Sequence, residues 1–199
     1  MNIKCYNLFN CPILESAINI DNKKLIKYCH LMEKKQKGRT VSNIGGYQSN
    51  NLDLKEKQIQ PLITNILQSL LSYINVCGFK NNINYYIDNM WLNINYFKDL
   101  NTAHIHPNCL FSGVYYLKVP KNSGGIVFHH PSQNLIDYDW LDNLKFNFNE
   151  INSSNWKFTP KEGSIYFFPS WLRHSVESNF NKKEERISIA FNIGVKNNE

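Results

Sequence analysis

The sequence His104-Ile-His106 is followed by an alternating run, Ser112-Gly-Val-Tyr-Tyr-Leu117, and later by Gly163-Ser-Ile-Tyr-Phe-Phe-Pro-Ser-Trp-Leu-Arg-His174. A further alternating run begins at Arg186. Residues two apart on a strand project to the same face, so the side chains of His104 and His106 can approach one point. His174 lies near the start of another expected strand, just after Pro169-Ser-Trp-Leu172, and neighbouring strands of a sheet can bring it beside the first pair. These segments predict a β-rich fold that carries a cluster of three histidines.

Period-two alternation extends over most of the chain from residue 83. It predicts strands at 91–97, 110–119, 126–129, 165–168 and 187–195, with turn-forming residues between them. Short strands with regular turns and no intervening helices are typical of an antiparallel sandwich or a jelly roll. We therefore expect a mainly β fold.

The first 80 residues show helical periodicity instead. One amphipathic helix is expected at about 22–36, with Asp21 as its N-cap, and a second at about 55–76, with Pro61 in its first turn and Gly78 as its stop. We expect one domain over residues 1–199. Residues 1–80 would form a helical flank on a jelly-roll core of about 81–195, which carries a polar and aromatic insertion near 132–156.

Composition narrows the class of protein. Of 199 residues, 42% are hydrophobic and 14% aromatic, which indicates a packed globule. The formal charge of +6 comes from scattered lysines without interleaved aromatic residues, so nucleic acid is not an expected partner. Five dispersed cysteines without a C-x-x-C pair favour reduced thiols over disulfides or structural zinc. No signal peptide or membrane span is predicted, and we expect a soluble, cytoplasmic protein.

The histidines are the candidate metal ligands. Ferrous iron in oxygenases is commonly held by two histidines and one carboxylate, which leaves open positions for a co-substrate and oxygen. His104 and His174 fit the histidine positions, but His106 stands where a carboxylate is expected. The alternative is that these are three ordinary histidines among the six in the chain.

Arg186 is the second candidate residue, and it shares a strand face with Ser188. A guanidinium group matches a carboxylate in two parallel hydrogen bonds, and a serine hydroxyl can add a third. An inward-facing arginine therefore indicates an anionic ligand. The alternative is a solvent-facing residue beside Glu184 and Glu185.

These motifs together resemble the iron(II)/2-oxoglutarate-dependent dioxygenases. The residues that carry the resemblance are His104-Ile-His106, Ser112–Leu117, Gly124-Gly-Ile-Val-Phe128, Phe168–His174 and Arg186-Ile-Ser188, and Ser42–Ser49 and Trp91-Leu-Asn93 add to it. The chain is most similar to small oxygenases found in marine bacteria and phages, with a more distant similarity to prolyl hydroxylases.

The resemblance implies a double-stranded β-helix, a jelly roll of the cupin-like kind, with Fe(II), 2-oxoglutarate and O2 as cofactor and co-substrates. It implies that His104, His106 and His174 are the catalytic metal ligands and that Arg186 binds the distal carboxylate of 2-oxoglutarate. Ser188 would assist Arg186, and Tyr115 would contact the co-substrate while Tyr116 faces the other way. The implied reaction is hydroxylation of an unknown substrate, either a small molecule or a protein side chain.

Two other functions stay open: a three-histidine, cupin-type dioxygenase that does not use 2-oxoglutarate, and a non-catalytic jelly-roll binding module. The insertion 132–156 is either a lid or specificity loop, or a variable surface loop. Self-association of the chain also stays open.

Overall fold

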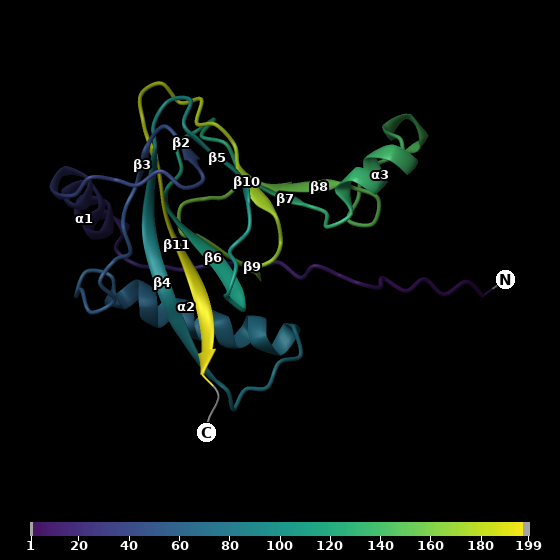
Figure 1. Ribbon diagram of the computed structural model, residues 1–199, viewed down its shortest axis with the longest axis horizontal. Helices are drawn as coiled ribbons and strands as arrows, with labels where there is room; N and C mark the ends of the chain where they lie inside the picture. The colour runs from purple at the N-terminus through teal and green to yellow at the C-terminus, as the bar shows by residue number, and fades with distance from the viewer. Residues whose placement is uncertain (1, 197–199) are drawn as a thin grey trace.

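The computed structural model describes residues 2–196, and within them the chain forms two antiparallel sheets (Figure 1). The larger sheet has the order β1 (Leu14–Ala17), β9 (Ser164–Pro169), β6 (Phe111–Lys118), β11 (Arg186–Lys196), β4 (Asn84–Asn95) and β3 (Tyr47–Gln48). The smaller sheet has the order β2 (Asn43–Ile44), β5 (Leu100–His104), β10 (His174–Val176), β7 (Ile126–His129) and β8 (Asn155–Phe158). The fold is a double-stranded β-helix with flanking helices, as predicted.

All five strands predicted from alternation are present as β4, β6, β7, β9 and β11. The N-terminal region differs from the expected helical flank, because β1 pairs with β9, β2 with β5 and β3 with β4. Strands of two to four residues are too short to show a period in sequence, which is why they were missed. For the same reason β8 was not separated from the insertion that precedes it.

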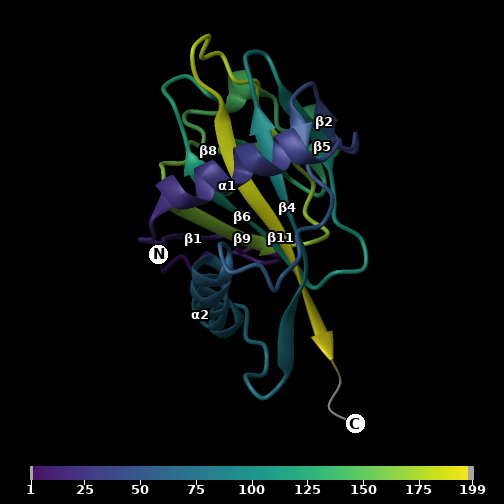
Figure 2. The same ribbon diagram turned by 90° about the vertical axis from the view of Figure 1, so that its left-hand side faces the viewer.

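Two helices cover the outer face of the larger sheet, and Figure 2 shows α1 (Asn22–Lys35) lying across its strands. The N-cap was predicted correctly, since the Asp21 side chain accepts a hydrogen bond from the Lys23 amide. Helix α2 (Gln60–Val76) begins about five residues later than expected, because its Pro61 lies at the first helical turn. Gly78 ends it with a φ of +71°.

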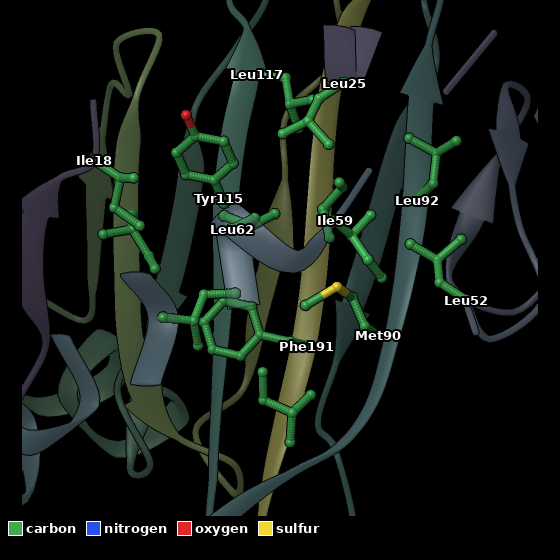
Figure 3. Packing of buried hydrophobic residues seen from close by; sticks show 14 of the residues in the cluster. Ile18, Leu25, Leu52, Ile59, Leu62, Met90, Leu92, Tyr115, Leu117 and Phe191 are labelled. Atoms are coloured by element: carbon green, nitrogen blue, oxygen red, sulfur yellow. The ribbon is translucent and has the colours of Figure 1, made fainter. Parts of the chain in front are cut away.

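The main hydrophobic core lies between these helices and the larger sheet. Figure 3 shows Leu25 and Leu62 of the helices together with Leu92, Tyr115 and Phe191 of the strands. A second, smaller cluster lies between the two sheets and consists of Val114, Tyr116, Ile126, Phe128, Tyr166, Phe168 and Leu172. The space between the sheets is therefore only partly filled by apolar side chains, and polar groups occupy the rest.

The insertion projects from the smaller sheet as an arm that contains α3 (Gln133–Asp139) and a short 3-10 helix, η1 (Asp142–Leu144) (Figure 1). Neither helix buries a residue, and large apolar side chains such as Tyr138, Leu144 and Phe146 are exposed. Among residues 2–196, no helix is long and apolar enough to span a membrane.

Candidate metal centre

Three histidines meet at one end of the space between the sheets. His104 is the last residue of β5, and His174 is the first residue of β10, directly opposite it in the antiparallel pair. One strand was expected to carry both His104 and His106, but β5 ends at His104 and His106 lies just beyond it. The His106 amide donates to the Ser170 carbonyl at 2.9 Å. One ring nitrogen from each of the three histidines lies within 4.8 Å of the others.

Hydrogen bonds define which nitrogen of each ring faces this point. The Nδ1 of His104 lies 2.7 Å from the carbonyl oxygen of Thr102, and the Nδ1 of His174 lies 2.9 Å from that of Leu172. A carbonyl only accepts, so each Nδ1 carries the proton and each Nε2 has a free lone pair. Histidine ligands of metals are commonly oriented by such backbone contacts.

His106 is oriented by side chains instead. Its Nδ1 lies 2.7 Å from the Oδ1 atom of Asn192 and 2.8 Å from the hydroxyl of Ser112. The Asn192 amide donates to Asn89, and the Asn89 amide donates to the carboxylate of Asp88 at 2.7 Å. Because a carboxylate only accepts, this chain of amides fixes the Asn192 oxygen towards His106. The Nε2 of His106 is buried and has no hydrogen-bond partner within the described chain.

Burial favours the neutral form of all three rings. It lowers the pKa of His106 to about 4, with a further contribution from positive charge on His104. It also lowers the pKa of His104, and it places the pKa of His174 well below its ordinary value. At neutral pH the three imidazoles are therefore uncharged, as metal ligation requires.

A narrow inner cavity of about 40 Å³ extends from the histidines between the sheets. On the larger sheet this cavity is lined by Tyr116, Ser188 and Asn93. These residues form a row across three strands, because Ser188 pairs with Tyr116 on one side and with Asn93 on the other. Among residues 2–196, neither the Tyr116 hydroxyl nor the Asn93 side-chain oxygen has a hydrogen-bond partner, although both are buried. An apolar cavity would not carry such groups, since an unpaired buried polar atom is costly.

Arg186 lies on the same strand face as Ser188 and is completely buried, so the alternative of a solvent-facing arginine was wrong. Its Nη1 donates to the carbonyls of Ser123 and Glu177. Its Nε and Nη2 are buried without partners in the part of the chain that the structure describes. Burial lowers the pKa of the guanidinium, while the Tyr116 hydroxyl and nearby carboxylates oppose that shift. The free edge of the cation fits an anion.

The expected orientation of the two tyrosines was wrong. Tyr115 points to the helix-covered face of the sheet, where its hydroxyl donates to the Asn22 side chain at 2.7 Å (Figure 3). Tyr116 lines the inner cavity. The register explains the reversal: Tyr116 pairs with Ser188, and directly paired residues of neighbouring strands share a face.

An outer cavity of about 570 Å³ adjoins the centre. The inner and outer cavities share Ser42, Trp91, His104 and His106. The outer one is lined by Arg39, Gln48 and Asp88 as well. A molecule in the outer cavity therefore reaches the histidines.

Several of these residues were missed by sequence reasoning. The alternation of β11 carried a signal for Asn192, because residues 186, 188, 190 and 192 share one face. Arg39 and Asp88 carried none, since they come from segments whose pairing is not visible in sequence, and Gln48 was noted only as part of the segment Ser42–Ser49.

The fold and the centre define a jelly-roll protein with a cluster of three histidines that could hold a metal ion. A family model described as "Putative 2OG-Fe(II) oxygenase" matches residues 89–192, which is more than half of the chain. The chain belongs to this family: it is a 2-oxoglutarate-dependent, non-haem iron oxygenase, whose cofactor is Fe(II) and whose co-substrates are 2-oxoglutarate and O2. No curated protein sequence matches it significantly.

Solved structures share the fold at low sequence identity. A prolyl-4-hydroxylase from Pseudomonas putida is 11% identical, with a TM-score of 0.62 over 93% of each chain. HygX from Streptomyces hygroscopicus, with nickel and 2-oxoglutarate bound, is 9% identical, with a TM-score of 0.60 over 92% of this chain and 82% of that one. A viral collagen prolyl hydroxylase from Paramecium Bursaria Chlorella virus-1, in a 2-oxoglutarate complex, is 14% identical, with a TM-score of 0.54 over 91% and 94%.

Proposed function

We propose that His104, His106 and His174 hold one Fe(II) through their Nε2 atoms. The observation that carries this proposal is that all three Nδ1 atoms face oxygen atoms within hydrogen-bonding distance, while the ring nitrogens that converge lie within 4.8 Å. Imidazole is a suitable ligand for iron, and three neutral rings leave other coordination positions for exogenous groups. His106 then takes the place of the carboxylate expected in the wider superfamily.

Arg186 is the proposed anchor for the distal carboxylate of 2-oxoglutarate. Its unpaired Nε and Nη2 form the edge of the guanidinium that accepts a carboxylate in two parallel hydrogen bonds. Tyr116 and Ser188 lie in the same inner row and can add hydroxyl contacts. This assignment replaces the one expected for Tyr115. The inner cavity is smaller than 2-oxoglutarate, so its lining side chains move apart on binding.

The proposed reaction is oxidative decarboxylation of 2-oxoglutarate coupled to hydroxylation of a substrate C–H bond. Bound Fe(II) supplies O2 activation. One oxygen atom enters the new hydroxyl group and the other enters succinate, with carbon dioxide as the third product. The protein binds the two organic molecules in adjoining cavities, keeps the three imidazoles neutral and, by burying its inner cavity, excludes water. The unpaired Arg186 favours this function over that of a three-histidine dioxygenase without 2-oxoglutarate, because such an enzyme binds no dicarboxylate that would pair with the guanidinium group.

The substrate is either a small molecule or a protein side chain. The second option rests on the similarity of fold to prolyl hydroxylases, which is analogy alone. We further propose that the whole chain acts as one domain, which is supported by short N-terminal strands that join both sheets. A cytoplasmic location is supported by the cysteines at positions 5, 11, 29, 77 and 109, all of which are free thiols.

The test is to measure succinate formed from 2-oxoglutarate under air with Fe(II), in the wild-type protein and in His174→Ala. We expect slow succinate formation without added substrate, and none above background in the variant. Wild-type protein that binds iron yet consumes no 2-oxoglutarate would favour the binding module or the other dioxygenase.

A further inference from the structure

The outer cavity beside the histidines has a charge pattern that the reaction itself does not explain. Apart from histidine, its lining residues include one cation, Arg39, and one anion, Asp88. Neither takes part in an ion pair within residues 2–196. A cavity that keeps one separated charge of each sign is complementary to a molecule that carries both.

Arg39 offers an unpaired donor for a carboxylate. Arg39 is held in place by its backbone amide, which donates to the Gln48 carbonyl at 2.8 Å, and by its Nη2, which donates to Asn51. Its Nε is buried and unpaired in the described chain. A carboxylate that accepts from this atom would remove the cost of leaving it unpaired.

The lining of the same cavity also offers acceptors. Gln48 is only 3% exposed, and its side-chain oxygen has no hydrogen-bond partner among residues 2–196. The carboxylate of Asp88 lines the same cavity and accepts one hydrogen bond, from Asn89. An ammonium group has three donors and needs acceptors of this kind. Both ends of a zwitterion therefore find complementary groups.

The position of the cavity places such a molecule next to the metal centre. His104 and His106 line it, and the ring of Trp91 contacts His106 edge-on, with centroids 5.3 Å apart. The indole gives an apolar wall for a short carbon chain that extends towards the histidines. A volume of about 570 Å³ is in the range typical of small-molecule sites.

We propose that the substrate is a free α-amino acid, whose carboxylate binds Arg39, whose ammonium group binds Gln48 and Asp88, and whose side chain carries the C–H bond that is hydroxylated. This inference rests on the proposed function and identifies its substrate class. A residue inside a polypeptide carries neither charge, so it would leave Arg39 and Asp88 unmatched. The two substrate classes left open above are thereby distinguished.

The experiment uses full-length protein loaded anaerobically with Ni(II), a redox-inert substitute for iron, and 2-oxoglutarate. Binding of each common L-amino acid is measured by calorimetry, beside its N-acetyl methylamide, which lacks both charges. We expect at least one free amino acid to bind and its capped form to bind at least tenfold more weakly. The same amino acid is expected to increase succinate formation in the Fe(II) enzyme.

Variants test the assigned residues. Arg39→Gln and Asp88→Asn should each weaken binding of the amino acid at least tenfold, whereas Lys37→Gln, an exposed change outside the cavity, should leave it unchanged. The absorption of the Fe(II)–2-oxoglutarate complex is recorded for every protein, so that loss of co-substrate binding is seen separately.

The outcomes are distinguishable. If the 2-oxoglutarate absorption forms but no free amino acid binds, or if capped forms bind equally well, the amino-acid assignment is overturned and the proposed function stands. If Arg39→Gln abolishes the 2-oxoglutarate absorption, Arg39 is the co-substrate anchor and the assignment is also overturned. If the wild-type protein gives no such absorption, the proposed function and the substrate assignment fail together.

Discussion

The Nδ1 of His106 lies 2.7 Å from the Oδ1 of Asn192, and this contact fixes the orientation of the His106 ring. Asn192 is held in turn by Asn89, and Asn89 by Asp88. In the proposed centre His106 takes the place of a carboxylate, and a neutral histidine leaves that centre one unit more positive than a carboxylate would.

The first prediction concerns Asn192. Replacing it with leucine, which is branched at the same carbon, removes the acceptor that holds His106, so metal affinity should fall about 10- to 100-fold. Competition between the protein and a chelator for Co(II) measures this affinity. Asn192→Asp keeps an oxygen acceptor and should retain most of it. Equal affinities of Asn192→Leu and wild type would show that the contact does not orient the ring.

A second prediction separates the two adjacent tyrosines. Tyr116→Phe removes a hydroxyl from the inner cavity and should weaken 2-oxoglutarate binding about 3- to 10-fold, the usual effect of one hydrogen bond. Tyr115→Phe is the matched control, which should lower stability by about 1 kcal/mol through loss of the bond to Asn22 and leave 2-oxoglutarate affinity unchanged. Titration of 2-oxoglutarate into the Ni(II) protein measures the affinity of both variants. The reverse pattern would return the co-substrate role to Tyr115.

The third prediction concerns Arg186. In the presence of Ni(II), 2-oxoglutarate at 100 times its Kd should stabilise the wild-type protein by about 2.7 kcal/mol and raise its Tm by roughly 5–10 °C. Arg186→Met should show no such increase, because the carboxylate has lost its buried partner. Thermal unfolding with and without 2-oxoglutarate provides the measurement. An unchanged increase in the variant would place the distal carboxylate elsewhere.

A fourth prediction is a loss of stability in acid for the metal-free protein. The pKa of His106 is about 4 in the folded chain, against an ordinary value of 6.5, so the unfolded chain binds a proton first as pH falls. The contribution of neutral His106 to the free energy of unfolding is therefore fully present above about pH 6.5. It is lost as pH falls towards 4, which lowers the free energy of unfolding by about 3 kcal/mol for this residue. Urea unfolding between pH 7.5 and 4.5 measures it. His106→Gln should show a weaker dependence, and equal slopes would contradict the assignment.

The larger part of the β fold could be predicted from sequence. The long strands β6 and β11 show clear alternation because one face packs against the helices and the other faces the cavity. That alternation also correctly placed Arg186 and Ser188 on one face. The histidine cluster was predictable because the two-residue spacing of His104 and His106 and the later position of His174 can be read from the sequence. This holds although the strand ends at His104.

What could not be predicted depends on registers and loops. Which of Tyr115 and Tyr116 faces inward is decided by how β6 pairs with β11, and a slip of one residue reverses every side chain. The hydrogen bond from Asn192 to Asn89 joins β11 and β4, which are far apart in the sequence. Arg39 reaches the outer cavity only because its backbone pairs with Gln48.

The most direct test of the three-histidine centre is anaerobic titration of the metal-free protein with Fe(II) and then 2-oxoglutarate, followed by visible absorption. We predict a charge-transfer band that requires both additions, is absent in His106→Ala and in His174→Ala, and needs higher 2-oxoglutarate concentrations in Arg186→Met. A band that forms normally without His106 would show that this residue does not hold the iron. Iron binding without any band would contradict the assignment of a 2-oxoglutarate site beside these three histidines.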